Sequence, residues 1–281
     1  MQIGGAIRQA AQSIQNKLGL ELPEASFEAN LLCQQVLNVN RAWLISHQSD
    51  ALEANQQAGF EALLQRRLNG EPMAYILGSR DFYGLQLKTT PATLIPRPDT
   101  ETLVEAAFAK IPQNTRLNIL DLGTGTGAVA LAIASQRPQT KIIAVDASLE
   151  ALKVATENAQ DFKLANVRLL ESNWFSALGG EKFDVIVSNP PYIAQDDEHL
   201  KQGDLRFEPL SALASGVDGL DDIRKIIQDA PDYLNPNGWL MLEHGYNQAH
   251  VVAALLNARG FSKVAHATDI AGTLRVTFGA I

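Results

Sequence analysis

Four consecutive residues near the middle of the chain, Asn189-Pro190-Pro191-Tyr192, combine groups that can hold a planar amino group. They follow Phe183 to Val187, an apolar run typical of a buried strand. Proline lacks the N–H that a strand ladder needs and has a fixed φ, so the two prolines end the strand and stiffen the turn. The turn therefore presents a side-chain amide, an aromatic ring and backbone carbonyls that the ladder does not use.

The chemistry that this turn allows is recognition of an –NH₂ group, which has two N–H donors. The side-chain oxygen of Asn189 and the carbonyl of Pro190 can each accept one of them, and Tyr192 can stack on a flat amide or base. We expect Asn189, Pro190, Pro191 and Tyr192 to bind such a group and aim its nitrogen at an electrophile. An ordinary strand-ending turn is the alternative, because Asn-Pro and Pro-Pro are common in turns.

A glycine-rich loop is the second chemical signal. It reads Asp121, Leu122, Gly123, Thr124, Gly125, Thr126 and Gly127, between an apolar strand and a helix that starts at Ala128. Glycines in such a turn let a ligand approach the backbone closely. Because Gly123, Gly125 and Ala128 also satisfy the dinucleotide pattern G-x-G-x-x-G/A, the loop alone does not identify the cofactor.

Two carboxylates favour S-adenosylmethionine over a dinucleotide. Asp121 would face an anionic pyrophosphate at an electrostatic cost, whereas it suits a cofactor with a cationic amino group and a sulfonium. Asp146 ends the second strand, 25 residues after Asp121, where a carboxylate can accept hydrogen bonds from ribose hydroxyls. Asp146 could also cap the helix that begins near Leu149.

From about residue 115 the hydrophobic pattern supplies the elements that must position these motifs. Strands alternating with helices predict an α/β fold with a doubly wound, mostly parallel sheet. The expected strands are 117–120, 141–145, 167–170, 183–187, 239–242 and 273–278. The expected helices are 128–135, 149–159, 220–227 and 251–258. If the strand order reverses after the third strand, the fourth lies beside the first and brings 189–192 next to the glycine loop.

Two segments precede this domain, which we assign to residues 96–281. Residues 1–70 are expected to form a small helical domain, in which Phe60, Leu63, Leu64 and Leu68 share one helix face. Phe27, Leu31, Val36 and Leu37 indicate a second amphipathic helix. Residues 71–95 predict a β-hairpin linker, because β-formers at 75–77, 82–83 and 85–87 are separated by glycine. Thr100 or Asp99 is expected to cap the helix through Val104.

Composition excludes several classes of protein. A net charge of −8 and a pI of about 5.2 argue against general binding to a nucleic-acid backbone. Cys33 is the only cysteine, so no disulfide framework is possible, and its apolar neighbours indicate a buried residue. The five histidines do not cluster, and we expect no metal site. No leader-like segment and no run of 18 apolar residues occurs, which predicts a soluble cytoplasmic protein.

Together, Asp121 to Gly127 and Asn189 to Tyr192 resemble the motifs of methyltransferases that modify planar amino nitrogens. This group includes DNA adenine and cytosine amino-methylases and protein glutamine methylases. The chain is most similar to one family, the peptide chain release factor N5-glutamine methyltransferases. The further matching segments are Gly70-Glu71-Pro72, Tyr75-Ile76, Phe82-Tyr83-Gly84, Leu94 to Glu101, and Glu208-Pro209 with Ala212-Leu213. The resemblance spans nearly the whole chain, although the first 65 residues match only in character.

The resemblance implies a seven-stranded, Rossmann-like methyltransferase sheet and a role for each motif. Gly123 to Gly127 and Asp146 would bind S-adenosylmethionine, and Trp174 would lie along its adenine, although Trp174 alone is equally consistent with the core. Asn189 would contact both cofactor and substrate, and Asn189 to Tyr192 would hold a glutamine. In that family the glutamine belongs to a Gly-Gly-Gln segment of class 1 peptide chain release factors.

Transfer to an amide nitrogen is difficult because its lone pair is delocalised into the carbonyl. Two acceptors on the N–H bonds return electron density to the nitrogen, and a rigid site aligns it for in-line displacement. No strong base lies beside the motif, so Asn189 and the Pro190 carbonyl are expected to act by position and electrostatics. Asp196, Asp197 and Glu198 are expected to form a solvated lid, with contact to the substrate peptide as the alternative.

Three other functions remain to be distinguished. A DNA amino-methylase would need a target-recognition region rich in Lys and Arg, which the sequence lacks. A Rossmann oxidoreductase is disfavoured by Asp121 and by the 189–192 turn, and a non-catalytic binding module by the presence of Asp121, Asp146 and Asn189. Since a glutamine side chain is too small to select one protein, residues 1–70 are expected to recognise the protein substrate.

Overall fold

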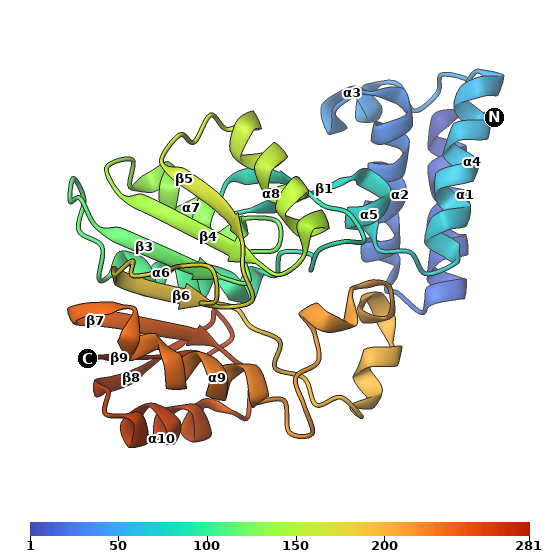
Figure 1. Cartoon of the computed structure of the whole chain (residues 1–281). Helices are drawn as coiled ribbons and strands as arrows, with labels where there is room; N and C mark the ends of the chain where they lie inside the picture. The colour runs from blue at the N-terminus through green and yellow to red at the C-terminus, as the bar shows by residue number, and fades with distance from the viewer. The chain divides into compact units, whose positions relative to one another are not determined.

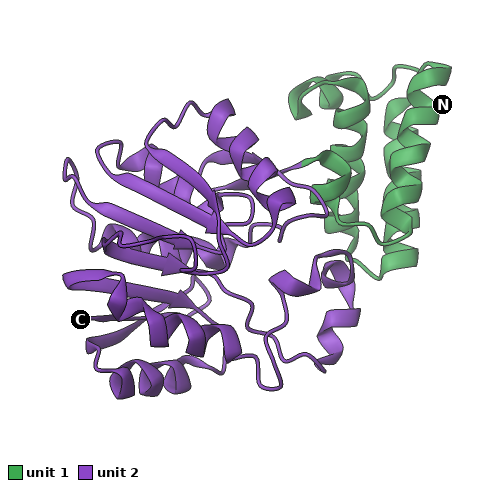
Figure 2. Ribbon diagram, viewed as in Figure 1, with its two compact units in different colours: residues 1–78 green, residues 79–281 purple.

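All residues from 1 to 281 are described by the computed structural model, and the chain divides after Gly78 into two units (Figure 2). Met1–Gly78 is helical, and Ser79–Ile281 contains the β-strands. The division lies beyond residue 70, where the sequence predicts that the helical segment ends. The difference is a short helix, Met73–Leu77, which also belongs to the first unit.

The first unit consists of helices around a small core. They are α1 (Ile3–Leu18), α2 (Leu22–Leu37), α3 (Arg41–Ser46), α4 (Ala54–Leu68) and α5 (Met73–Leu77). Phe60 of α4 is buried there, as its helical spacing predicts. Phe27 of α2 is 57% exposed, so the prediction that it lies on the buried face of this helix is wrong. The buried face of α2 contains Ala29 and Leu32 instead. Cys33 is buried, and burial raises the pKa of its thiol to about 11.

The segment 71–95 differs from the predicted hairpin at its beginning. Residues 75–77 belong to α5 and not to a strand, because Gly78 ends this helix at φ 73° and Ile76 packs into the helical core. An apolar run of three residues does not distinguish a helix from a strand. The hairpin itself is short: β1 (Ser79–Phe82) pairs antiparallel with β2 (Leu85–Lys88), and both belong to the second unit.

The second unit is built on a seven-stranded sheet in the order β5-β4-β3-β6-β7-β9-β8 (Figure 1). Its strands are β3 (Asn118–Leu122), β4 (Lys141–Asp146), β5 (Val167–Glu171), β6 (Phe183–Ser188), β7 (Leu234–Glu243), β8 (Ser262–Thr268) and β9 (Leu274–Ala280). The first five are parallel to one another, and β9 pairs antiparallel with both β7 and β8. The predicted doubly wound, mostly parallel α/β fold is confirmed.

Helices cover both faces of this sheet. They are α6 (Glu101–Phe108), α7 (Ala128–Gln136), α8 (Leu149–Asp161), α9 (Asp221–Asp229) and α10 (Ala249–Arg259). Side chains of α6 and α7 share one core with Met241 of β7. Side chains of α9 and α10 share the other with Leu240 and Leu242. Successive residues of β7 thus serve opposite faces, as the period of a strand requires.

Two parts of the second unit are not predicted by the sequence. Strand β8 is an edge strand that pairs only with β9, and its residues are mostly polar and only partly buried, so no apolar run marks it. Between β6 and α9 the chain forms single turns of 3₁₀ helix, namely η2 (Glu198–Lys201), η3 (Gly203–Phe207) and η4 (Leu210–Ala212). A further one, η5 (Ala230–Asp232), follows α9.

The pairing of β3 with β6 positions the two chemical motifs. The parallel register places Leu122 opposite Ser188, and the Ser188 hydroxyl donates to the Leu122 carbonyl at 2.7 Å. The expected neighbourhood of the first and fourth strands is therefore confirmed. Because both strands end at this pair, the glycine loop and the Asn-Pro-Pro-Tyr turn leave the same edge of the sheet side by side.

Candidate active site

A cavity of about 670 Å³ lies at the carboxyl ends of β3, β4 and β6. Small-molecule pockets occupy roughly 300–1,000 Å³. The predicted site residues in its lining are Asp121, Gly123, Thr124, Gly125, Thr126, Asp146, Trp174, Asn189 and Pro191. Gly127, Pro190 and Tyr192 lie outside the lining. One cavity therefore gathers most, but not all, of the residues that the sequence singles out.

The glycine loop adopts backbone conformations that side chains rarely tolerate. Gly123 has φ 71°, and a Cβ there would lie 3.3 Å from the ring of Trp174. Gly127 has φ 84° and precedes the first turn of α7, where a Cβ would meet Leu131 at 3.0 Å. The loop needs glycine both for its turn and for the close packing of its neighbours.

Asp121 is buried at the end of β3, with 2% of its surface exposed. Its Oδ2 accepts from the Thr124 hydroxyl at 2.6 Å and from the Ala130 amide at 3.3 Å. Burial raises the pKa of Asp121 to about 6, against the opposing effect of these two hydrogen bonds. The cavity therefore contains a carboxylate that a nearby cation would stabilise.

Asp146 shapes the loop as well as the cavity. Its Oδ2 accepts from the Gly125 amide at 2.9 Å, and its Oδ1 accepts from the Ser148 amide at 2.9 Å. The cap of α8 comes from Ser148, whose hydroxyl accepts from the Ala151 amide. Asp146 is thus not the capping residue that the sequence allowed, and it faces the cavity from the end of β4.

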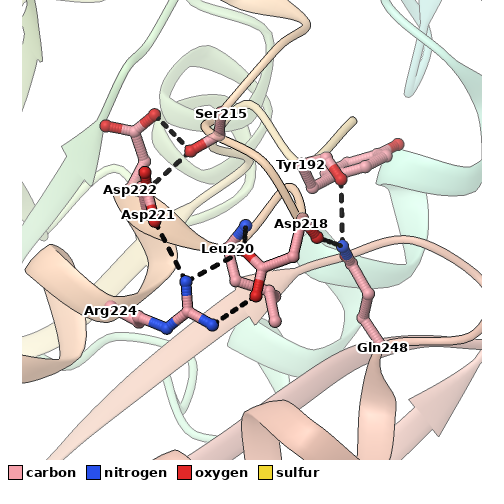
Figure 3. A network of polar contacts seen from close by, with 8 residues as sticks. All are labelled: Tyr192, Ser215, Asp218, Leu220, Asp221, Asp222, Arg224 and Gln248. Atoms are coloured by element: carbon pink, nitrogen blue, oxygen red, sulfur yellow. Dashed lines mark hydrogen bonds and ion pairs between the residues drawn. The ribbon is translucent and has the colours of Figure 1, made fainter. Parts of the chain in front are cut away.

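Trp174 is held over the loop by a long-range contact. Its backbone has φ 53°, and its indole N–H donates to Asp222 Oδ1 at 3.2 Å. The other oxygen of Asp222 accepts from the Ser215 hydroxyl at 2.7 Å (Figure 3). Asp222 is a residue of α9 and also lines the cavity, so α9 fixes the orientation of the Trp174 ring.

The side chain of Asn189 is oriented by Thr100. Asn189 Nδ2 donates to Thr100 Oγ1 at 3.1 Å, across 89 residues of sequence. Thr100 ends the 3₁₀ turn η1 (Pro98–Thr100) and precedes α6, but its side chain makes no capping bond. The expectation that Thr100 or Asp99 caps this helix is therefore wrong for Thr100, because its hydroxyl contacts Asn189 instead.

Tyr192 is fixed at both its backbone and its side chain. Its hydroxyl donates to Glu243 Oε1 at 3.3 Å. Its carbonyl accepts from Gln248 Nε2 at 3.0 Å, as Figure 3 shows. Its ring packs against the core shared with α9 and α10. Burial raises the pKa of Tyr192 above its usual range, so the hydroxyl keeps its proton.

A loop that follows the turn also borders the cavity. Pro209 and Ala212 line it, and the buried carboxylate of Glu208 pairs with Arg97. Asp196 and Glu198 are exposed, and Asp197 accepts from the His199 amide at 2.9 Å to begin η2. The residues near the site that sequence reasoning missed are Asp222, Glu243 and Gln248. Each is a single polar residue outside any motif, so no local pattern marks it.

Two classes of feature are not found. No group of three or more His, Cys, Asp or Glu side chains is placed to hold a metal ion. No helix is both long and apolar enough to cross a bilayer.

Two family models match the chain. The model described as PrmC N-terminal domain matches residues 6–78, and the model described as Methyltransferase small domain matches residues 99–205. The first ends where the helical unit ends, at Gly78. The second spans β3 to β6, the strands whose ends surround the cavity.

Individual proteins are similar over nearly the full length. A protein of Xylella fastidiosa (strain Temecula1) named release factor glutamine methyltransferase is 48% identical over 90% of this chain and 92% of its own. One of the same name from Escherichia coli (strain K12) is 46% identical over 90% and 91%. Among solved structures, a methyltransferase from Pyrococcus furiosus has a TM-score of 0.54 at 23% identity, covering 77% of this chain and 96% of that chain. That structural likeness shows the fold alone.

Proposed function

We propose, since the chain belongs to the release factor glutamine methyltransferase family, that it transfers a methyl group from S-adenosylmethionine to the side-chain amide nitrogen (N5) of a glutamine in a peptide chain release factor. The observation that carries the proposal is the orientation of Asn189. Its NH₂ half is engaged by Thr100, which leaves its oxygen to accept an N–H of the substrate amide.

The charges around the cavity fit S-adenosylmethionine better than a dinucleotide. The charged residues in its lining are Arg97, Asp121, Asp146, Glu150 and Asp222. The one guanidinium in this set is paired with Glu208, so carboxylates dominate. A carboxylate-lined cavity attracts a cation and opposes an anionic pyrophosphate.

Three residues would hold the cofactor. Asp146 has acceptor capacity for ribose hydroxyls, and Asp121 can face a cationic amino group. Trp174 offers its ring, already fixed by Asp222, to the adenine. When bound, S-adenosylmethionine supplies an electrophilic methyl group on its sulfonium.

The acceptor site needs two acceptors for two N–H bonds. Asn189 supplies its side-chain oxygen, and the Pro190 carbonyl is the second candidate, within a turn that two prolines make rigid. These acceptors orient the substrate amide and return electron density to its nitrogen, and neither is a base. The N–C bond forms as the S–CH₃ bond breaks, and the methylated nitrogen then loses its extra proton to water. We assign Pro191, which lines the cavity, to the wall that holds the glutamine, and Tyr192, whose ring packs against the core, to the support of this turn.

The experiment that tests the function compares acceptors. Labelled methyl groups from S-adenosylmethionine are offered to a class 1 release factor, to the same factor with the glutamine of its Gly-Gly-Gln segment replaced by alanine, to DNA and to free glutamine. We expect transfer to the unmodified factor alone. Transfer to DNA would instead identify an amino-methylase of nucleic acid, which the acidic composition disfavours.

The partner and the compartment follow from this function. We propose class 1 release factors as the protein substrate, a cytoplasmic location because these factors act there, and no direct binding to nucleic acid.

We further propose that the helical unit selects the protein substrate. The glutamine side chain occurs in most proteins, so selection needs surface away from the chemistry, whose binding energy also orients the glutamine. All residues that line the cavity lie in the second unit. A protein lacking residues 1–78 should retain cofactor affinity within a few-fold and lose methylation of release factor. Full methylation by this truncated protein would refute the assignment.

A further inference from the structure

The function proposed above does not explain two segments that carry the resemblance to the family. They are Leu94 to Glu101, and Glu208-Pro209 with Ala212-Leu213. Both border the cavity, and the lining residues that they supply are Leu94, Pro96, Arg97, Thr100, Pro209 and Ala212. Since 111 positions separate Arg97 from Glu208, a contact of the folded chain must hold the two segments in the same wall.

That contact is a buried carboxylate. The side chain of Glu208 has no exposed surface. Its Oε1 accepts from Arg97 Nη2, and its Oε2 accepts from the Ile95 amide at 3.3 Å. Both oxygens are therefore bonded to the first segment, one to a charged side chain and one to the backbone. A buried carboxylate needs such partners, because leaving it unpaired away from water is costly.

The second segment is also bound to the Asn-Pro-Pro-Tyr turn. Ile193, which follows Tyr192, donates its amide to the Leu213 carbonyl at 2.9 Å. Its own carbonyl accepts from the Ser215 amide at 2.9 Å. These two backbone bonds fix the second segment beside the far end of the turn.

The near end of the turn is bound to the first segment, because Asn189 Nδ2 donates to Thr100 Oγ1 at 3.1 Å. The three segments thus form a closed circuit of contacts, and the Glu208 contact is the link that closes it. We call this circuit the acceptor wall, and it comprises residues 94–100, 189–193 and 208–215.

We propose that Glu208 is a positioning residue for the methyl acceptor: by binding Arg97 and the Ile95 amide it closes the acceptor wall and holds the two segments in fixed positions beside the Asn-Pro-Pro-Tyr turn. The proposal rests on the proposed function, because it takes this turn as the place where the glutamine binds. It deepens that function by giving a role to both segments that the function leaves unexplained.

The link matters because little else fixes the second segment. Residues 208–215 contain one single turn of 3₁₀ helix, η4, and no strand of the sheet (Figure 1). Short 3₁₀ turns have poor hydrogen-bond geometry and do not hold a wall by themselves. Without the link, Pro209 and Ala212 would move away from the cavity and admit water. A displacement of about 1 Å at a reacting group costs about 10²-fold in rate.

The pair also sets the charge of the acceptor wall. Arg97 is the one cation in the cavity lining, and without Glu208 it would repel the sulfonium of the cofactor. The two partners are not equivalent. The side chain of Arg97 is 31% exposed and reaches water if Glu208 is neutralised, whereas Glu208 without Arg97 is a buried, unpaired charge. Loss of Arg97 alone should therefore be worse than loss of the pair.

The first test needs neither substrate nor cofactor. The amides of residues 212–215 are all hydrogen-bonded, so their hydrogen exchange in the full chain reports opening of the acceptor wall. In Glu208→Gln we expect these amides to exchange about tenfold faster or more, with the amides of β3 unchanged, because the opening is local. Unchanged exchange at 212–215, or an equal increase throughout the chain, would overturn the proposal.

The second test is a double-mutant cycle on kcat with release factor as the acceptor. We expect a loss of about tenfold in Glu208→Gln and about 10²-fold in Arg97→Met, with the Kd for S-adenosylmethionine in Glu208→Gln within about threefold. The double variant should be more active than Arg97→Met alone, because no buried charge is left unpaired. A double variant as impaired as Arg97→Met, or more so, would contradict the proposal.

The matched control is Asp184→Asn. The two oxygens of Asp184 also bond to two other segments, the Asn118 amide and the Asn235 side chain, both at 2.8 Å, but at the amino ends of the strands. It should lower the Tm and leave kcat unchanged. Equal losses of kcat in Glu208→Gln and Asp184→Asn would refute a positioning role. If the wild-type protein methylates no release factor, the proposed function is wrong, while hydrogen exchange still decides whether Glu208 closes the wall.

Discussion

The two edges of the cavity are held in different ways. The cofactor edge, which we define as Asp121, residues 123–127 and Asp146, is held by groups close in sequence. Asp146 accepts from Ser148, two residues on, and from Gly125, 21 residues away. Thr124 donates to Asp121, three residues back.

The acceptor edge, residues 189–192, is held by distant side chains. Asn189 bonds to Thr100 across 89 residues, and Tyr192 bonds to Glu243 across 51 and to Gln248 across 56. Its own prolines stiffen the turn but orient neither side chain. The conformation of a loop that binds a common cofactor can thus be encoded locally. The orientation of the Asn189 and Tyr192 side chains depends instead on the assembled fold.

The largest effect should come from Asn189→Ala, which removes an acceptor while leaving the cofactor edge intact. We expect turnover to fall about 10²–10³-fold, as for the loss of one preorganised polar contact. The Kd for S-adenosylmethionine should rise only a few-fold. Single-turnover kinetics and calorimetry on the same preparation measure both values. Near-normal turnover would remove Asn189 from the acceptor edge.

Asp146→Ala tests the opposite edge. Loss of hydrogen bonds to a charged group costs about 1.5–3 kcal/mol, which corresponds to a Kd for S-adenosylmethionine about 10–100-fold higher. Turnover at saturating cofactor should change little, because contacts to a ribose are equal in the ground and transition states. Calorimetry gives the Kd, and an unchanged value would exclude Asp146 from the cofactor edge.

Asp121 should make the cofactor edge sensitive to pH. Its pKa is raised to about 6 by burial, so its contribution to stability is present at acidic pH and is lost as the pH rises through 6. Affinity for a cationic cofactor has the opposite sign, because it needs the ionised form, and should fall about tenfold between pH 7 and pH 5.

The control for this pH effect is Asp121→Asn. It should bind S-adenosylmethionine weakly at both pH values and show a higher Tm than the wild type at pH 7.5 when no cofactor is present. Calorimetry and thermal unfolding at both pH values measure this. A wild-type affinity that stays constant from pH 7 to pH 5 would disprove the charge assigned to Asp121.

The smallest effect should come from Gln248→Ala, which removes the donor to the Tyr192 carbonyl and the acceptor of the Gly245 amide. Water can replace part of these bonds, so we expect a loss of about 1 kcal/mol of stability and a few-fold lower turnover. The Kd for S-adenosylmethionine should not change. Asn257→Ala, within the helix α10 that Gln248 precedes, is the matched control, because the Asn257 side chain bonds only to the Ala253 carbonyl. A changed Kd in Gln248→Ala would show that the two edges are coupled.

Local patterns predicted the fold where apolar runs were long, and failed where they were short or absent. The parallel strands and their helices follow from alternating buried segments, and the neighbourhood of β3 and β6 follows from the reversal of strand order. Residues 75–77 form a helix because Ile76 packs into the core of the helical unit. An apolar run of three residues is too short to predict that packing. Strand β8 lacks an apolar run because it is a half-exposed edge.

The sequence by itself determined which groups stand at the ends of β3, β4 and β6, because glycine, proline and strand periodicity act on neighbouring residues. Only the tertiary structure decided that the side chain of Asn189 bonds to Thr100 and that the hydroxyl of Tyr192 bonds to Glu243. These contacts form only when η1 and β7 pack beside the end of β6. A sequence pattern does not show these two contacts, because the bonded residues are 51 and 89 positions apart and share no motif.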